Sequence, residues 1–170
     1  MTSLKQNAIE LLTRPDIPSG MRKQIEEMKG YHLHLVIQKQ LEDIDINKKE
    51  GRLCLPLNNL LFDFTNHKER ELFNNNNNNG INKMERIMEV KILDEAQRET
   101  SILLNKSIIG NQYYFSLMGG WSSFVDTNFL RTGNIIQLWS FRRERLIPSN
   151  RTFVSDLYFA LNKVDHRICL

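Results

Sequence analysis

Two segments of this sequence gather basic side chains of the kind that neutralise nucleic-acid phosphates. Their basic residues are Lys39, Lys48, Lys49 and Arg52 in the first, and Arg142, Arg143, Arg145 and Arg151 in the second. Each segment also has a plainer interpretation. Residues 39–52 hold four acidic residues beside the four basic ones, which favours solvated ion pairs and a nearly neutral mean field. The arginine cluster favours a solvated loop after a strand that ends at Phe141.

The composition of the whole chain permits a polyanionic partner without requiring one. Its 170 residues carry 23 Lys and Arg against 20 Asp and Glu, a formal net charge of +3. This is weaker than the dense positive charge of a dedicated phosphate-backbone binder. A hydrophobic fraction of 41% suits one globular domain plus an extension.

Other chemistry has little support in the residue pattern. His32 and His34 are close enough to share a metal ion, but the other two histidines are distant in sequence and tetrahedral zinc needs three or four ligands. The two cysteines, Cys54 and Cys169, lack C-x-x-C spacing. Motifs such as G-x-S-x-G and H-E-x-x-H do not occur. We therefore expect no metal, no cofactor and no enzymatic activity.

The chain shows no feature of a secreted or membrane protein. Its first residues have no basic region followed by an apolar stretch, and no apolar run approaches 18 residues. Two isolated cysteines are too few for a disulfide framework. These observations predict an intracellular protein that does not span a membrane.

Two amphipathic helices are expected in residues 1–30, which we predict to be a helical extension. The apolar positions are Leu4, Ala8, Leu11 and Leu12 in the first helix, which ends before Pro15, and Met21, Ile25 and Met28 in the second, with Gly30 as its C′ residue.

After Gly30 the apolar period changes to two residues, since Tyr31, Leu33, Leu35 and Ile37 are expected on one strand face and residues 32, 34, 36 and 38 on the other. Six further short strands are expected near residues 52–55, 88–92, 102–104, 113–117, 135–141 and 157–161. Trp121 and Trp139 are expected in the core, and Ser122 or Ser123 as a helix cap. Short strands with turn residues between them indicate a mainly β fold, a barrel or a sandwich.

A low-complexity segment interrupts this pattern. Residues 74–79 are six consecutive asparagines, followed by Gly80, and none of them can contribute to a core. We expect a flexible poly-Asn loop at 74–80.

Short motifs between residues 31 and 162 carry a family resemblance. They are LVIQKQL at 35–41, Asp43-Ile44, RLCLP at 52–56, Gly120-Trp121, Phe124-Val125, Asn128, Leu130, Gly133-Asn134 and LWSFR at 138–142. In this order and spacing they resemble the plant-specific B3 DNA-binding domain. The helical segment at 12–30 and LWSFR are most similar to a little-characterised plant subfamily. The resemblance implies a seven-stranded open β-barrel, or pseudobarrel, with two short helices, over residues 31–165.

The resemblance also implies a binding mode for double-stranded DNA. In B3 domains such as those of auxin response factors, two loops enter the major groove. By position these are Lys39–Arg52 and Asn105–Gln112, and the implied DNA-binding residues are Lys39, Lys48, Lys49, Arg52, Asn105, Lys106, Ser107, Asn111 and Gln112. The second loop lacks the arginines that such relatives usually present. Asn and Gln pair with adenine edges, so an A/T-leaning or weak preference is expected.

Two functions are therefore compatible with the sequence. The first is a nuclear DNA-binding domain of a plant transcriptional regulator. The second is a protein-interaction module on the same barrel, in which residues 4–28 dimerise or recruit a partner. An N-terminal helix whose leucines are not covered by the barrel would favour the second. A nuclease would need a carboxylate cluster with a lysine, and no such spacing is present.

Overall fold

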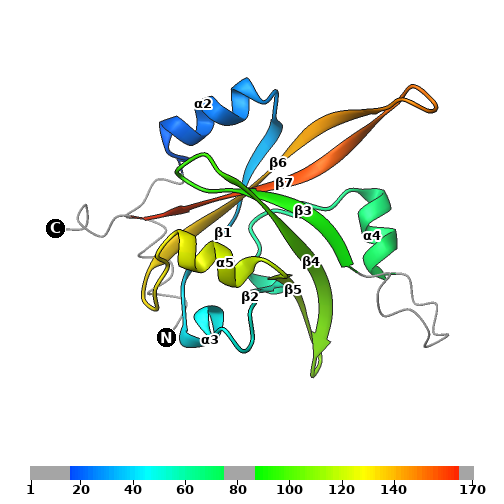
Figure 1. Cartoon of the computed structure of the whole chain (residues 1–170). Coiled ribbons are helices and arrows are strands. Elements are labelled where there is room, and N and C mark those ends of the chain that lie inside the picture. Colours follow the sequence, from blue (N-terminus) through cyan, green and yellow to red (C-terminus); the bar gives the residue numbers. More distant parts are fainter. Residues whose placement is uncertain (1–15, 75–86, 165–170) are drawn as a thin grey trace.

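A computed structural model describes residues 16–74 and 87–164 of the chain. Within these residues seven strands form one sheet (Figure 1). The strands are β1 (Tyr31–Gln40), β2 (Leu53–Pro56), β3 (Ile87–Leu93), β4 (Glu99–Ile109), β5 (Gln112–Met118), β6 (Ile135–Ile147) and β7 (Thr152–Lys163). The helices are α2 (Ser19–Glu27), α3 (Asp43–Ile46), the 3-10 turn η1 (Leu57–Asn59), α4 (His67–Asn74) and α5 (Trp121–Thr127).

The sheet is curled and open. Its strand order is β1-β6-β7-β3-β4-β5-β2, so β1 and β2 are the two edges. All neighbouring strands are antiparallel except β3 and β7, which are parallel. In the segment after η1, the backbone N–H of Leu61 donates to the carbonyl of Val36 in β1 at 2.8 Å. The prediction of a mainly β fold with seven strands and an open sheet is confirmed.

The interior of the curled sheet holds the main apolar core. Trp121 and Phe124, both 1% exposed, project into it from α5 and stack with ring centroids 5.7 Å apart. The predicted burial of both tryptophans is confirmed, since Trp139 is buried as well, in a second cluster. The predicted serine cap is wrong. Gly120, with φ of +117°, stands at the N-cap of α5, where a Cβ would lie 2.6 Å from the carbonyl oxygen of Ser101.

Helix α2 covers the outer surface of the sheet (Figure 1). Met21 and Ile25 pack there against Trp139 and Phe141 of β6. The helix ends in a Schellman motif, in which the N–H of Gly30 donates to the carbonyl of Ile25 at 2.8 Å and the next bond inward also forms. The first predicted helix lies outside the described residues, and the boundary between extension and barrel near residue 30 stays a prediction.

The C′ position of α2, which was predicted for Gly30, is occupied by Lys29. Lys29 takes the left-handed C′ position with φ of +60°. Gly30 is required for a different reason, because a Cβ there would lie 2.7 Å from Cγ2 of Ile25 and 2.8 Å from Cδ2 of Phe141. The missing side chain lets the helix end approach β6.

Strand β1 does not keep the single apolar face that its sequence predicts. Register shifts interrupt its pairing with β6 between Tyr31 and His34 and between Leu35 and Ile37. As a result Leu35 packs toward the outer cluster, whereas Val36 and Ile37 are both buried in the main core. A bulge of this kind re-aims side chains and cannot be read from alternation.

The loop expected after Phe141 is instead the far half of a long β6–β7 hairpin. Arg142 is buried, and its guanidinium donates to both carboxylate oxygens of Glu69 at 2.8 and 2.6 Å. Arg143 donates to the carbonyl of Met28 at 2.9 Å. Two of the four arginines thus hold α4 and the end of α2 on the sheet, so their assignment to a solvated loop was wrong.

The segment before the poly-Asn run contains a helix that was not predicted. Asn66 and Glu69 bond each other's backbone N–H groups at 2.9 Å, a reciprocal cap at the start of α4. Asn74 is the last residue of α4 rather than part of a loop. The rest of the predicted poly-Asn loop lies outside the described residues. No helix in the described ranges is long and apolar enough to cross a membrane.

Replacing Arg142 is expected to destabilise the fold strongly. Arg142→Met leaves Glu69 buried and unpaired, which costs about 3 to 5 kcal/mol of unfolding free energy. The matched control is Arg145→Met on the same strand, whose pair with Asp156, at 2.8 Å, is exposed to solvent and should contribute little to stability. Urea unfolding of both variants measures the difference. Equal losses would show that the buried pair does not anchor α4.

Candidate nucleic-acid interface

The first predicted loop is a firmly anchored segment built around Asp45. Its carboxylate is 1% exposed, accepts the backbone N–H of Glu42 at 2.9 Å, and accepts a bond from the Lys39 ammonium at 3.1 Å. The indole N–H of Trp121 donates to the Asp45 carbonyl at 2.8 Å. The sequence favoured a solvated ion pair at Asp45. Instead, Asp45 is buried and anchors this segment to the core.

The four basic residues of this segment are not equally available. The Lys39 ammonium is held by Asp45 and by the carbonyl of Cys54 at 3.2 Å. Lys48 pairs with Asp126 at 3.3 Å and Arg52 with Glu50 at 3.2 Å, both at the surface. Lys49 is exposed and has no ion pair among the described residues. Surface pairs exchange partners at little cost, so Lys48, Lys49 and Arg52 can reach a phosphate.

The second predicted loop, residues 105–112, is a β-hairpin. Asn105, Lys106 and Ser107 belong to β4, Gln112 begins β5, and only Gly110 and Asn111 form the turn. Gly110 has φ of +63° while that of Asn111 is not positive, the pattern of a type II′ turn. The loop prediction was wrong, although a Gly-Asn pair between two apolar runs is a hairpin signal that was present in the sequence.

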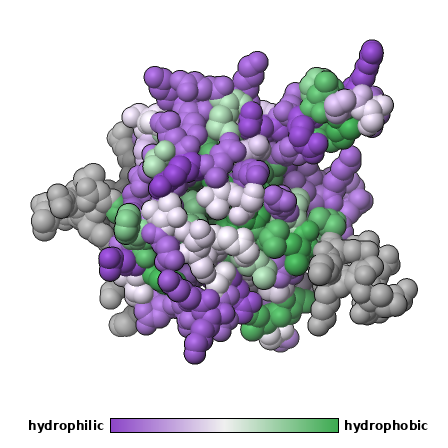
Figure 2. All heavy atoms as spheres, viewed as in Figure 1, coloured by the Kyte–Doolittle hydropathy of each residue, from purple (hydrophilic) through white to green (hydrophobic). Residues whose placement is uncertain are grey.

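The tip of this hairpin is uncharged and exposes three large apolar side chains beside its two amides. Ile108 and Ile109 are 54% and 55% exposed, and Tyr113 is 48% exposed. The register pairs Ile108 with Tyr113 and Ile109 with Gln112. The hairpin projects beyond the body of the sheet at the lower edge of Figure 1, and apolar atoms appear at the same edge in Figure 2. The segment around α3 lies at this end of the molecule too (Figure 1).

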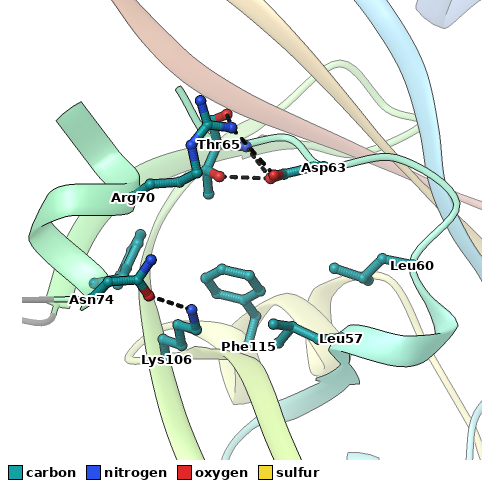
Figure 3. A pocket seen from close by; sticks show the side chains of 9 residues that line it. Leu57, Leu60, Asp63, Thr65, Arg70, Asn74, Lys106 and Phe115 are labelled. Carbon is teal, nitrogen blue, oxygen red and sulfur yellow. Dashed lines mark hydrogen bonds and ion pairs between the residues drawn. The ribbon is translucent and has the colours of Figure 1, made fainter. Parts of the chain in front are cut away.

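Lys106 turns away from the tip and into a pocket between α4 and the hairpin (Figure 3). The pocket has a volume of about 350 Å³. The Lys106 ammonium donates to Oδ1 of Asn74 at 2.6 Å and lies 5.2 Å from the ring centroid of Tyr113. Burial lowers the pKa of Lys106 below its usual value, and the nearby Asp63 carboxylate opposes that shift. Lys106 thus has partners within the protein.

The remaining predicted residues lie along the hairpin. Asn105 and Ser107 are half-buried on β4, and Asn111 is exposed in the turn. The Tyr114 hydroxyl donates to Oε1 of Gln112 at 2.9 Å, which orients the amide. The cations at 48, 49 and 52 thus lie on the segment between α3 and β2, and the amides at 111 and 112 lie at the turn and the start of β5.

The histidines considered as metal ligands are placed apart from other donors. The His34 ring stacks on Phe62 with centroids 3.8 Å apart, and His32 has φ of +53°. No group of three or more His, Cys, Asp or Glu within residues 16–74 and 87–164 is arranged to hold a metal ion.

A plant family matches almost the whole chain. The family model described as B3 domain-containing protein At2g31720-like matches residues 13–164. The curated relatives include, from Arabidopsis thaliana, B3 domain-containing protein At5g24050, 29% identical over 141 residues, and B3 domain-containing protein At1g05920, 27% identical over 160 residues. These matches cover 76% and 84% of this chain. The chain belongs to this family of B3 domain-containing proteins.

The relatives are longer than this chain. The matched regions make up 38% and 49% of those two proteins, so the chain spans less than half of the length of the curated relatives it matches. Among solved structures, it is similar to the Arabidopsis FUS3-DNA complex, with a TM-score of 0.44 and 13% identity over 78% of this chain and all of that one. It is also similar to the Arabidopsis thaliana transcription factor LEC2-DNA complex, with a TM-score of 0.41 and 14% identity over 74% of this chain and 94% of that one. The family assignment rests on the sequence matches.

Removing the Asp45 carboxylate is expected to loosen the first segment. Asp45→Ala deletes a helix cap and leaves the half-buried Lys39 ammonium without its carboxylate, a loss of about 1 to 3 kcal/mol. Amide hydrogen exchange over residues 42–52 should become faster. Asp43→Ala is the control, because its bond to the Thr132 hydroxyl, at 2.8 Å, is exposed. Similar exchange in both variants would contradict the anchoring role of Asp45.

Proposed function

We propose that this chain is the double-stranded DNA-binding domain of a plant transcriptional regulator, acting in the nucleus without a cofactor or an enzymatic activity. The observation that carries the proposal is the β4–β5 hairpin, which projects at the end of the molecule that also presents the basic segment (Figure 1). A two-stranded ribbon fits the DNA major groove, and the amides at its tip match adenine edges. Membership of the B3 domain family supports the same function.

The two segments divide the work of binding. Lys48, Lys49 and Arg52 contact phosphates and set the position of the domain, while Asn111 and Gln112 contact base edges. Asn105 and Ser107 lie on β4, farther from the turn than Asn111. At that position they support the ribbon and lie near the DNA backbone. Lys39 and Lys106 have partners inside the protein and contribute their positive field rather than a direct bond.

A protein-interaction function has one observation in its favour. At the far end of the β6–β7 hairpin, Leu146 and Phe153 pair across the strands and are 47% and 66% exposed. Figure 2 shows apolar atoms at this end, at the upper right. Self-association or partner binding through the N-terminal helices is the other form of this alternative. In the described part of that extension, Met21 and Ile25 are already buried against the sheet.

Selection of bound sequences from a random duplex pool tests the proposal directly. We expect a preferred site, A/T-leaning because amides rather than arginines occupy the tip. Salt-sensitive binding with no preferred sequence would contradict sequence-specific recognition and favour the protein-interaction alternative.

Removing two lysines from the first segment is expected to weaken binding to every duplex alike. Lys48→Ala combined with Lys49→Ala should reduce the slope of log K against log salt by about 0.9 for each phosphate that the protein no longer neutralises. The control is Arg22→Ala combined with Lys23→Ala, which removes equal charge from exposed positions on α2, on the other side of the molecule (Figure 1). Equal slopes in both double variants would show that the net charge, not this segment, governs binding.

Truncating the turn amide should change preference rather than general affinity. Asn111→Ala is expected to cost about 1 to 3 kcal/mol on the preferred duplex and little on random DNA. Fluorescence anisotropy with both duplexes gives the two affinities. A uniform loss on both would assign Asn111 to phosphate contact instead.

A further inference from the structure

We propose that Ile109 and Gln112 together read a single A·T base pair, with the Gln112 amide on the adenine and the Ile109 side chain against the thymine methyl group. This inference rests on the proposed function, because it assumes that the β4–β5 hairpin enters the major groove. It goes beyond that function by naming a specificity-determining apolar residue and the chemical group that it recognises.

The register of the hairpin makes the two residues a unit. Ile109 lies directly opposite Gln112, beside the Gly110-Asn111 turn. Directly opposed residues in an antiparallel pair share one face, with Cβ atoms about 4.5 to 5.5 Å apart. On the major-groove edge of an A·T pair, N7 and N6 of adenine and the thymine methyl lie in one row. An amide and an aliphatic side chain held side by side match that row.

The hydrogen bonds of Gln112 leave it able to bind adenine. Its Oε1 accepts the Tyr114 hydroxyl at 2.9 Å, and an amide oxygen has a second lone pair for the adenine N6 amino group. Its amide nitrogen, which makes no hydrogen bond among the described residues, can donate to N7. The bond from Tyr114 holds the amide in one orientation before DNA arrives, so less side-chain freedom is lost on binding.

The opposite face of the hairpin is committed elsewhere. Ile108 and Tyr113 form the next cross-strand pair and point the other way. That face continues to Lys106, whose ammonium lies 5.2 Å from the Tyr113 ring centroid and 5.8 Å from that of Phe115, at the pocket in Figure 3. Ile108 and Ile109 are exposed to almost the same extent, 54% and 55%, so truncating either one removes a similar area without opening a core. They form a matched pair of test and control.

The first measurement uses the full chain and the duplex recovered by selection. Each thymine is replaced in turn by uracil, which lacks only the methyl group. At one position the wild-type protein should bind about three- to fivefold more weakly, the value of one buried methyl group. Ile109→Ala should lose a similar factor on the thymine duplex and show no further loss with uracil. Ile108→Ala should keep the full uracil effect.

The second measurement locates the amide contact. Replacing adenines one at a time by 7-deazaadenine removes the N7 acceptor. The adenine that is sensitive to this change in the wild type, and no longer so in Gln112→Ala, should be the base-pairing partner of the uracil-sensitive thymine. Thermal unfolding of each variant confirms that it is folded as the wild type is.

Four results would overturn the inference. A preferred duplex that tolerates uracil at every position, or a full uracil effect in Ile109→Ala, would remove the thymine contact while the proposed function stands. Sensitive adenine and thymine positions in different base pairs would separate the two residues. The absence of any preferred duplex would overturn the proposed function and this inference together.

Discussion

The end of the molecule that we propose to face DNA depends on the burial of one carboxylate. Asp45 is almost fully enclosed, caps α3 through the backbone of Glu42, and holds the Lys39 ammonium. Its carbonyl accepts the Trp121 indole, so the same residue joins the basic segment to the main core. A buried carboxylate needs these partners, because an unpaired one would cost several kcal/mol. Lys48 and Lys49, which follow α3, are therefore attached to an anchored helix rather than to a flexible loop.

The β4–β5 hairpin is held in place in another way. The β4–β5 hairpin is held by its own ladder and by β3 and β2 on either side, and a two-residue turn leaves no slack at the tip. Arg142 contributes from further away, because its buried pair with Glu69 fixes α4 beside the pocket into which Lys106 points. Under the proposed function, a basic side chain that is held by partners within the protein is less available for direct contact with DNA. Arg142, Lys39 and Lys106 are all held in this way.

Patterns that depend on local sequence were predictable, and those that depend on tertiary pairing were not. Alternation and turn residues located the seven strands, and apolar context located both tryptophans in the core. Composition alone could not distinguish Arg142 from Arg145, since only the position of Glu69 makes the first a buried residue. The bulge in β1 and the burial of Asp45 arise from contacts with distant strands and helices. The Gly110-Asn111 pair indicates a hairpin at 105–112, and the expectation of a loop did not take this signal into account.

The absence of arginine from the tip changes how specificity can arise. An arginine at the tip would add both affinity and a preference for guanine, whereas an amide beside an isoleucine adds shape and hydrogen bonding without net charge. Under the proposed function, attraction to the phosphates comes from residues 48, 49 and 52, while discrimination comes from the tip. Because these two sources lie on separate segments, salt should change the first and leave the second almost unaltered. The preference among sequences should therefore persist at salt concentrations that weaken binding to all of them.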